Sequence, residues 1–142
     1  MAHTLHAQGM DEIVREMNAL AANGKALGDV TEAMIEAGAE AAKAVWKQVA
    51  EARRLRDTGD MIDSIGSAAP NKRETGAVYR DIYPLGKDRY GTSNAMKAYL
   101  LHYGTSRIKA TYWVDEVEAR VVEPLHDAMA AVWDDWKVGN LT

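Results

Sequence analysis

The feature that most constrains the fold is an alanine-rich stretch in which small apolar side chains recur at helical spacing. It predicts a long helix over residues 31–54, capped by Asp29 or Thr31. The apolar stripe of this helix consists of Met34, Ala37, Gly38, Ala41, Val45 and Val49. Small side chains let two backbones approach closely, so we expect this helix to pack tightly against another element.

Two further helices are predicted from the same kind of periodicity. The first covers residues 10–22 and is stopped by Asn23-Gly24. The other covers residues 111–137 at the C-terminal side. Pro124 lies inside that pattern and predicts a kink or a break, because proline removes a backbone N–H from the helix.

The core has to be built without phenylalanine. The 142 residues include 24 Ala, no Phe and 4 Trp, so the bulky apolar side chains are few. A chain of this length suits a single domain with a modest core. We therefore predict one domain over residues 1–142, with residues 1–9 flexible, and we expect Trp113 and Trp133 to anchor the last helix on the core.

The middle of the chain predicts shorter elements. Residues 58–65 indicate a turn leading into a short helix or strand, and residues 76–84 indicate a strand. A short helix follows, capped by Ser93 or Asn94 and closed by Gly104 with a positive φ. One face of that helix carries Met96, Tyr99, Leu100 and Tyr103. Together these patterns predict an α+β fold, with long N-terminal and C-terminal helices packed on a small antiparallel β-sheet.

Charge is unevenly distributed along the chain. Residues 1–52 carry 4 basic and 8 acidic side chains, residues 53–109 carry 11 and 6, and residues 110–142 carry 2 and 7. The net charge of −4 argues against a protein that coats nucleic acid non-specifically. The basic middle is interleaved with tyrosines, which favours an interface with another subunit or partner. Its candidate residues are Arg80, Lys87, Arg89, Tyr90, Arg107 and Lys109.

Motifs for catalysis or cofactor binding are absent from the sequence. Residues 86–92 contain the glycines and the lysine of a phosphate loop in the wrong order, so we expect a flexible hairpin loop there. There is no cysteine and the 4 histidines do not cluster, so no catalytic residue, cofactor or metal site is predicted. No apolar run approaches the roughly 20 residues that span a bilayer, and no membrane partner is expected.

Two alternative functions remain open at this stage. The basic, tyrosine-rich segment 78–109 has the mixture of rings and cations that a nucleic-acid-binding module uses. A small enzyme that uses the 86–92 loop is the other alternative, although no reaction follows from its residues.

Two segments resemble motifs of a phage protein family. Residues 58–65, Thr-Gly-Asp-Met-Ile-Asp-Ser-Ile, resemble the Thr-Gly-x-Leu-x-x-Ser-Ile element of small phage structural proteins. Residues 98–106 contain a segment similar to their aromatic-Gly-Thr turn. In order and spacing, residues 10–137 resemble the head–tail joining, neck or tail-completion proteins of long-tailed, siphovirus-like bacteriophages. The chain departs from the family at His102, where an acid is usual, and at Tyr112-Trp113, where Pro-Phe is common.

The resemblance implies a virion structural protein of a phage or prophage, and not an enzyme. Such a subunit forms a homo-oligomeric ring, a hexamer or a dodecamer, that joins or completes the head–tail junction. Its partners would be copies of itself and other connector or tail-tube proteins, and DNA would pass through the channel without specific recognition. Assembly would take place in the cytoplasm of the bacterial host. The structural turn residues implied by the motifs are Gly59, Gly104 and Thr105.

Overall fold

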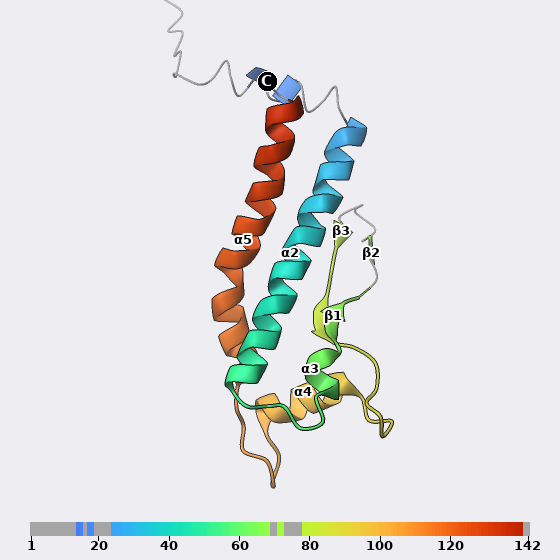
Figure 1. The fold of residues 1–142 in the computed structure, drawn as a ribbon, viewed down its shortest axis with the longest axis vertical. Helices are drawn as coiled ribbons and strands as arrows, with labels where there is room; N and C mark the ends of the chain where they lie inside the picture. The colour runs from blue at the N-terminus through green and yellow to red at the C-terminus, as the bar shows by residue number, and fades with distance from the viewer. Residues whose placement is uncertain (1–13, 16, 19–23, 69–70, 73–77, 141–142) are drawn as a thin grey trace, which may run out of the picture.

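Two long helices form the frame of the molecule (Figure 1). The computed structural model describes residues 14–15, 17–18, 24–68, 71–72 and 78–140. Helix α2 spans Gly24–Ala52 and helix α5 spans Trp113–Asn140. They lie side by side along most of their length, and their contact is the most extensive in the structure.

Shorter elements lie at one end of this helix pair and along the side of α2 (Figure 1). They are α3 (Asp60–Asp63), β1 (Ile65–Ser67), β2 (Asn71–Lys72), β3 (Val78–Tyr79), β4 (Ile82–Pro84) and α4 (Asn94–Tyr103). Strand β1 pairs antiparallel with β4, and β2 pairs antiparallel with β3. The predicted α+β fold, with long N-terminal and C-terminal helices and a small antiparallel sheet, is confirmed. We call the end that carries α3 and α4 the core end, and the opposite end the far end.

The predicted strand over residues 76–84 is interrupted. Residues 76 and 77 lie outside the described part of the chain, and the rest forms two short strands separated at Arg80 and Asp81. The first of these pairs with β2 through Tyr79 and Asn71, and the second pairs with β1 through Ile82 and Ser67. The predicted continuous strand is wrong at Arg80 and Asp81, where Arg80 forms an ion pair with Glu36 of α2 and the Asp81 carbonyl accepts the Ala68 N–H at 2.9 Å.

Helix α2 begins well before the predicted residue 31. It starts at Gly24, and the predicted end of the preceding helix before Asn23-Gly24 lies outside the described residues. The Thr31 hydroxyl donates to the Leu27 carbonyl at 2.8 Å within the helix, so Thr31 does not cap the helix. Val30 is 3 % exposed, and its burial shows that packing stabilises this first part despite two glycines. Most of the predicted helix 10–22 lies outside the described residues, as do residues 1–9; positions 14–15 and 17–18 are helical.

Helix α2 ends in a hydrogen-bonded turn that reverses the chain. Arg54 has φ +57°, the Leu55 N–H donates to Ala50 O at 3.0 Å, and the Arg54 N–H donates to Glu51 O at 3.0 Å. This is a Schellman motif with arginine at the position that glycine usually occupies. Leu55 packs against the buried core, which holds the turn in place.

Helix α5 passes through Pro124 without the predicted break. It begins at Trp113, two residues after the predicted start, and remains helical to Asn140. Pro124 and Arg120 are both exposed. Proline has no N–H to donate to the Arg120 carbonyl, and the exposed position of both residues leaves this side of the helix open to water, which can replace the missing hydrogen bond.

Trp113 occupies the centre of the core. Its side chain is 0 % exposed, and its ring meets Trp46 edge-on with centroids 5.3 Å apart. Its Nε1–H donates to the Ala98 carbonyl at 3.2 Å, so the indole is also satisfied as a donor. The other buried members of this cluster are Val45, Val49, Ala50, Met61, Ile62, Ile65, Ala98 and Val117. The prediction for Trp113 is confirmed.

Trp133 does not belong to this core. It is half-buried on the distal part of α5 and stacks on Trp136 with centroids 5.2 Å apart. The prediction that it anchors α5 in the core was wrong, because the cluster is confined to the core end. The small-residue stripe of α2 does allow tight packing: a Cβ on Gly38 would lie 3.1 Å from Met129 Cγ of α5.

Candidate functional site

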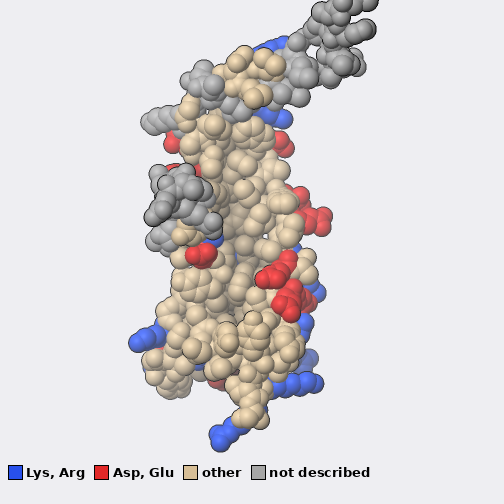
Figure 2. All heavy atoms as spheres, turned by 180° about the vertical axis from the view of Figure 1, so that it is seen from behind, with Lys and Arg blue, Asp and Glu red and all other residues tan. Residues whose placement is uncertain are grey.

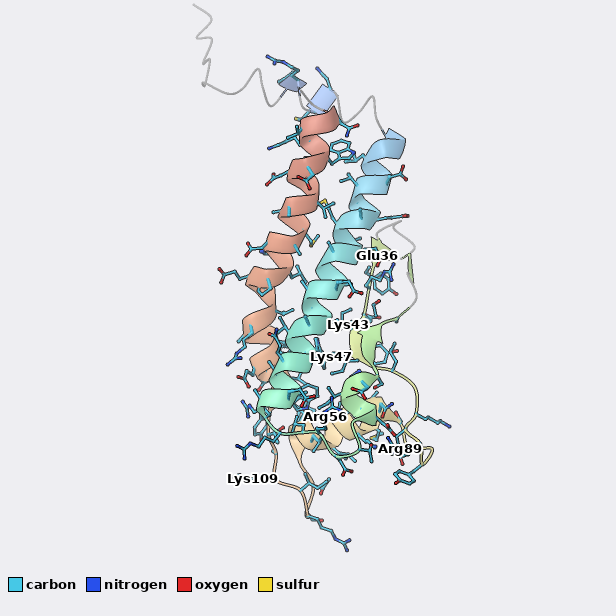
Figure 3. The ribbon with its side chains drawn as sticks, in the orientation of Figure 1. Glu36, Lys43, Lys47, Arg56, Arg89 and Lys109 are labelled. Atoms are coloured by element: carbon cyan, nitrogen blue, oxygen red, sulfur yellow. The ribbon has the colours of Figure 1, made fainter. Side chains whose placement is uncertain are left out.

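The six residues predicted to form an interface separate into two groups. Arg80 and Arg89 form internal ion pairs, with Glu36 and Asp60. The other four are exposed at the core end, and none of them has an ion pair among the described residues. They are Lys87, Tyr90, Arg107 and Lys109. Figure 3 shows Lys109 and the pair-forming Arg89 at this end of the molecule.

Arg89 joins the loop that follows β4 to helix α3. Its Nε donates to Asp60 Oδ2 at 2.9 Å and its NH2 group donates to Asp60 Oδ1 at 2.8 Å, while its backbone N–H donates to Oδ2 at 3.0 Å. These bonds hold the pKa of Asp60 well below its usual range. A cation held in this bidentate way serves the fold, and is not available as a free interface charge.

Asp88 organises the same loop, residues 85–93. Its Oδ1 accepts the backbone N–H groups of Tyr90 at 2.9 Å and Thr92 at 2.8 Å. Its Oδ2 pairs with Lys97 of α4, and this contact, with the two N–H groups, lowers the pKa of Asp88. The expected flexible hairpin is therefore a hydrogen-bonded loop, from which Tyr90 projects with 76 % of its surface exposed.

A second loop, residues 104–110, projects beyond the end of the helix pair (Figure 1). Gly104 has φ +78°, which confirms the predicted positive φ, and a Cβ there would lie 2.7 Å from both Ala110 N and Ile108 O. The Thr105 hydroxyl accepts the N–H groups of Arg107 at 3.1 Å and Ile108 at 3.0 Å. The Thr105 N–H donates to Ile108 O at 2.8 Å. We call residues 105–109 the basic finger.

A tyrosine-lined groove opens beside the finger, between α4, β4 and the start of α5. Its volume is about 290 Å³. Trp46, Ala98 and Val114 line its less exposed part. The exposed rings of Tyr83, Tyr99 and Tyr103 and the carboxylates of Asp115 and Glu118 complete the lining. We call this hollow the tyrosine groove.

The buried face of α4 is the opposite of the apolar face noted in the sequence. Asn94, Ala98 and His102 are buried, whereas Met96, Tyr99 and Tyr103 are 52–58 % exposed. Sequence reasoning therefore missed the groove, although Tyr99 and Tyr103 stand four residues apart and would share a helix face. Their rings lie 4.8 Å apart between centroids.

His102 links the groove to the start of α5. Its Nδ1 accepts the Val114 N–H at 3.2 Å, which leaves the proton of a neutral ring on Nε2. Nε2 lies 3.7 Å from Asp115 Oδ1, too far for a strong hydrogen bond. The side chain of Asp115 is 69 % exposed.

The acidic residues of α5 differ in how they are paired. Glu116 accepts from Arg53 Nε at 2.6 Å and pairs with Arg120 at 2.8 Å, and these cations lower its pKa. By contrast, Glu118, Glu123 and Asp127 are exposed without an ion pair among the described residues. In Figure 2 acidic side chains lie along the α5 edge, and Lys and Arg lie at the lower margins around an uncharged surface.

Neither metal-binding geometry, nor membrane-spanning helices, nor similarity to known proteins assigns a function to this site. Within the described ranges, no group of three His, Cys, Asp or Glu side chains could hold a metal ion. No helix in the described part of the chain is long and apolar enough to cross a membrane. No family model, curated protein or solved structure matches the chain.

Proposed function

We propose that this protein is a virion structural protein, a ring-forming connector subunit at the head–tail junction of a long-tailed phage or prophage. The proposal starts from the two sequence motifs that resemble those of the head–tail joining and tail-completion proteins. It includes copies of the chain itself and neighbouring connector or tail-tube proteins as partners, and the virion as its location.

The two motifs form one structural unit, which supports reading them together. Residues 58–65 contribute Gly59, Met61 and Ile62 to a cavity of about 270 Å³, and the second motif contributes Leu100 and Leu101 to the same cavity. Gly59 has φ +92° at the start of α3. Two short motifs separated by more than thirty residues therefore meet at the core end.

The observation that carries the proposal is unpaired charge of opposite sign in two separate places. Exposed cations that have no ion pair with any described residue lie on the finger and on the 85–93 loop, whereas exposed carboxylates follow α5. A contact between the basic end of one copy and the acidic side of the next uses different surfaces on each copy. Such a heterologous contact generates a ring when its rotation closes, and the charges give it orientation.

Particle composition and mass together test this function. We expect the chain in purified virions, or in particles made by an induced prophage, and rings in electron micrographs of the purified protein or of its complex with a partner ring. Neighbouring portal, capsid and tail-tube genes would support the same conclusion. A chain that is absent from particles and forms no ring with any head or tail component contradicts the proposal.

Nucleic-acid binding is the second candidate, favoured by Lys87, Tyr90, Arg107 and Lys109 at one exposed end. This function requires binding to DNA or RNA that weakens steeply as salt rises. An electrophoretic shift assay at low salt decides: no shift excludes the module, and a shift lost in Arg107→Glu/Lys109→Glu supports it.

A further inference from the structure

We infer that the basic finger of one copy docks in the tyrosine groove of a second copy. This inference rests on the proposed function, because it names the surfaces through which connector subunits would join. Both surfaces belong to the same chain, and they are complementary in charge: the finger carries cations and the groove carries carboxylates.

The finger has a rigid shape suited to insertion. Gly104 starts it with a positive φ, and the Thr105 hydroxyl and N–H fold it through three hydrogen bonds. The side chain of Ile108 lines the 270 Å³ cavity beside Leu100 and Leu101 and keeps 40 % of its surface exposed, between the exposed cations Arg107 and Lys109. A loop that is already ordered loses little conformational freedom when it binds.

The groove has the complementary arrangement. Its centre is apolar and aromatic, with Trp46 and Val114 beside the rings of Tyr99 and Tyr103. Asp115 and Glu118 are exposed carboxylates in its lining, and neither has a Lys or Arg partner among the described residues. An apolar centre with a polar margin is the usual organisation of a protein interface.

Charge complementarity favours the basic finger of a second copy as the partner of the groove. Two cations flank Ile108 on the finger, and two carboxylates lie beside the apolar lining of the groove. The guanidinium of Arg107 can in addition stack on a tyrosine face. The 85–93 loop fits less well, because Arg89 and Asp88 already form internal ion pairs with Asp60 and Lys97.

Charge reversal on each side tests the docking. The finger variant is Arg107→Glu/Lys109→Glu, the groove variant is Asp115→Lys/Glu118→Lys, and a fourth protein carries all four changes. The matched control, Asp134→Lys/Asp135→Lys, makes the same charge change on α5 near the far end. Light scattering and sedimentation then give the mass of each, relative to the 15.6 kDa monomer, over a range of concentrations.

We expect the parent to associate, and each two-site reversal to weaken association at least about tenfold, since like charges then face each other. The fourfold variant should regain most of the parent's association, because the charges are again opposite. Mixing the finger variant with the groove variant should restore it to a lesser extent, since one reversed finger matches one reversed groove.

Several outcomes overturn the docking while leaving the connector proposal to the particle test. One is that the finger variant and the groove variant associate as strongly as the parent. Another is that the Asp134→Lys/Asp135→Lys control weakens association as much as these two variants do. A parent that stays monomeric throughout the range is a third. The milder Asp115→Asn/Glu118→Gln variant, with its thermal melt compared with the parent's, distinguishes lost docking from lost folding.

Discussion

The core end and the far end of the helix pair carry similar apolar stripes, yet they are built differently. At the core end, α2 and α5 are joined by α3, α4 and β1 around the fully buried Trp113. Toward the far end the two helices pack mainly on each other, and Trp133 and Trp136 stay half-buried. The difference shows that helical periodicity identifies the inner face of a helix, but not how much structure covers it.

The largest effect should come from Trp113→Ala at the core end. We expect a loss of about 3–5 kcal/mol in unfolding free energy, because a fully buried indole leaves a cavity. Urea unfolding followed by circular dichroism measures this loss. Trp113→Phe keeps a ring against Trp46 and should cost clearly less; equal costs for the two variants would contradict a packing role.

The second effect concerns the turn that starts the finger. Gly104→Val should cost about 1–3 kcal/mol from backbone strain, with a further cost from the contacts at 2.7 Å. Gly28→Ala in α2 is the control: nothing lies within 4 Å of the added Cβ, so helix propensity should raise stability slightly. A Gly104→Val melting temperature equal to the parent's would disprove the turn geometry.

Trp133→Ala tests the far end with the same chemical change as Trp113→Ala. A half-buried side chain removes less apolar surface from water, so we expect a loss of about 1–2 kcal/mol. The same urea experiment provides the comparison. If both tryptophan deletions cost the same, the two ends share one cooperative core and the contrast between them fails.

Lowering the pH should destabilise the core end before the far end, because the core end contains ion pairs of carboxylates. Each of these ion pairs is weak, since solvent screens it. The lowered pKa values of Asp60, Asp88 and Glu116 stabilise the fold above about pH 4, where these groups are ionised even in the unfolded chain. This stabilisation is lost as the pH falls through their folded-state pKa values. Hydrogen exchange below pH 4 should show α3 and the 85–93 loop losing protection before the distal part of α5.

Capping residues in the sequence correctly predicted the helix whose ends are fixed by residues at those ends. Helix α4 begins after Ser93, whose hydroxyl accepts the Met96 N–H at 3.2 Å, and it closes at Gly104 as expected. The early start of α2 and the passage of α5 through Pro124 depend on packing between the two helices. The helix propensity of a single residue carries no information about that packing.

The candidate interface was predicted only in part, for a similar reason. Six basic or aromatic residues looked equivalent along the chain, but Arg80 and Arg89 find carboxylates on α2 and α3 that are distant in sequence. The finger residues have no such partner among the described residues. Net charge in a segment therefore says little about the charge available at the surface until the internal ion pairs are known.

Helix α2 begins, at Gly24, at the same far end of the molecule where helix α5 ends, at Asn140, and this has a mechanical consequence (Figure 1). A force that pulls Gly24 and Asn140 apart separates α2 from α5 starting at the far end. The contacts between the two helices then break one helical turn after another. A load applied between the finger and the far end acts along both helix axes, and many contacts must slip at once. The molecule should therefore resist axial tension far better than splitting.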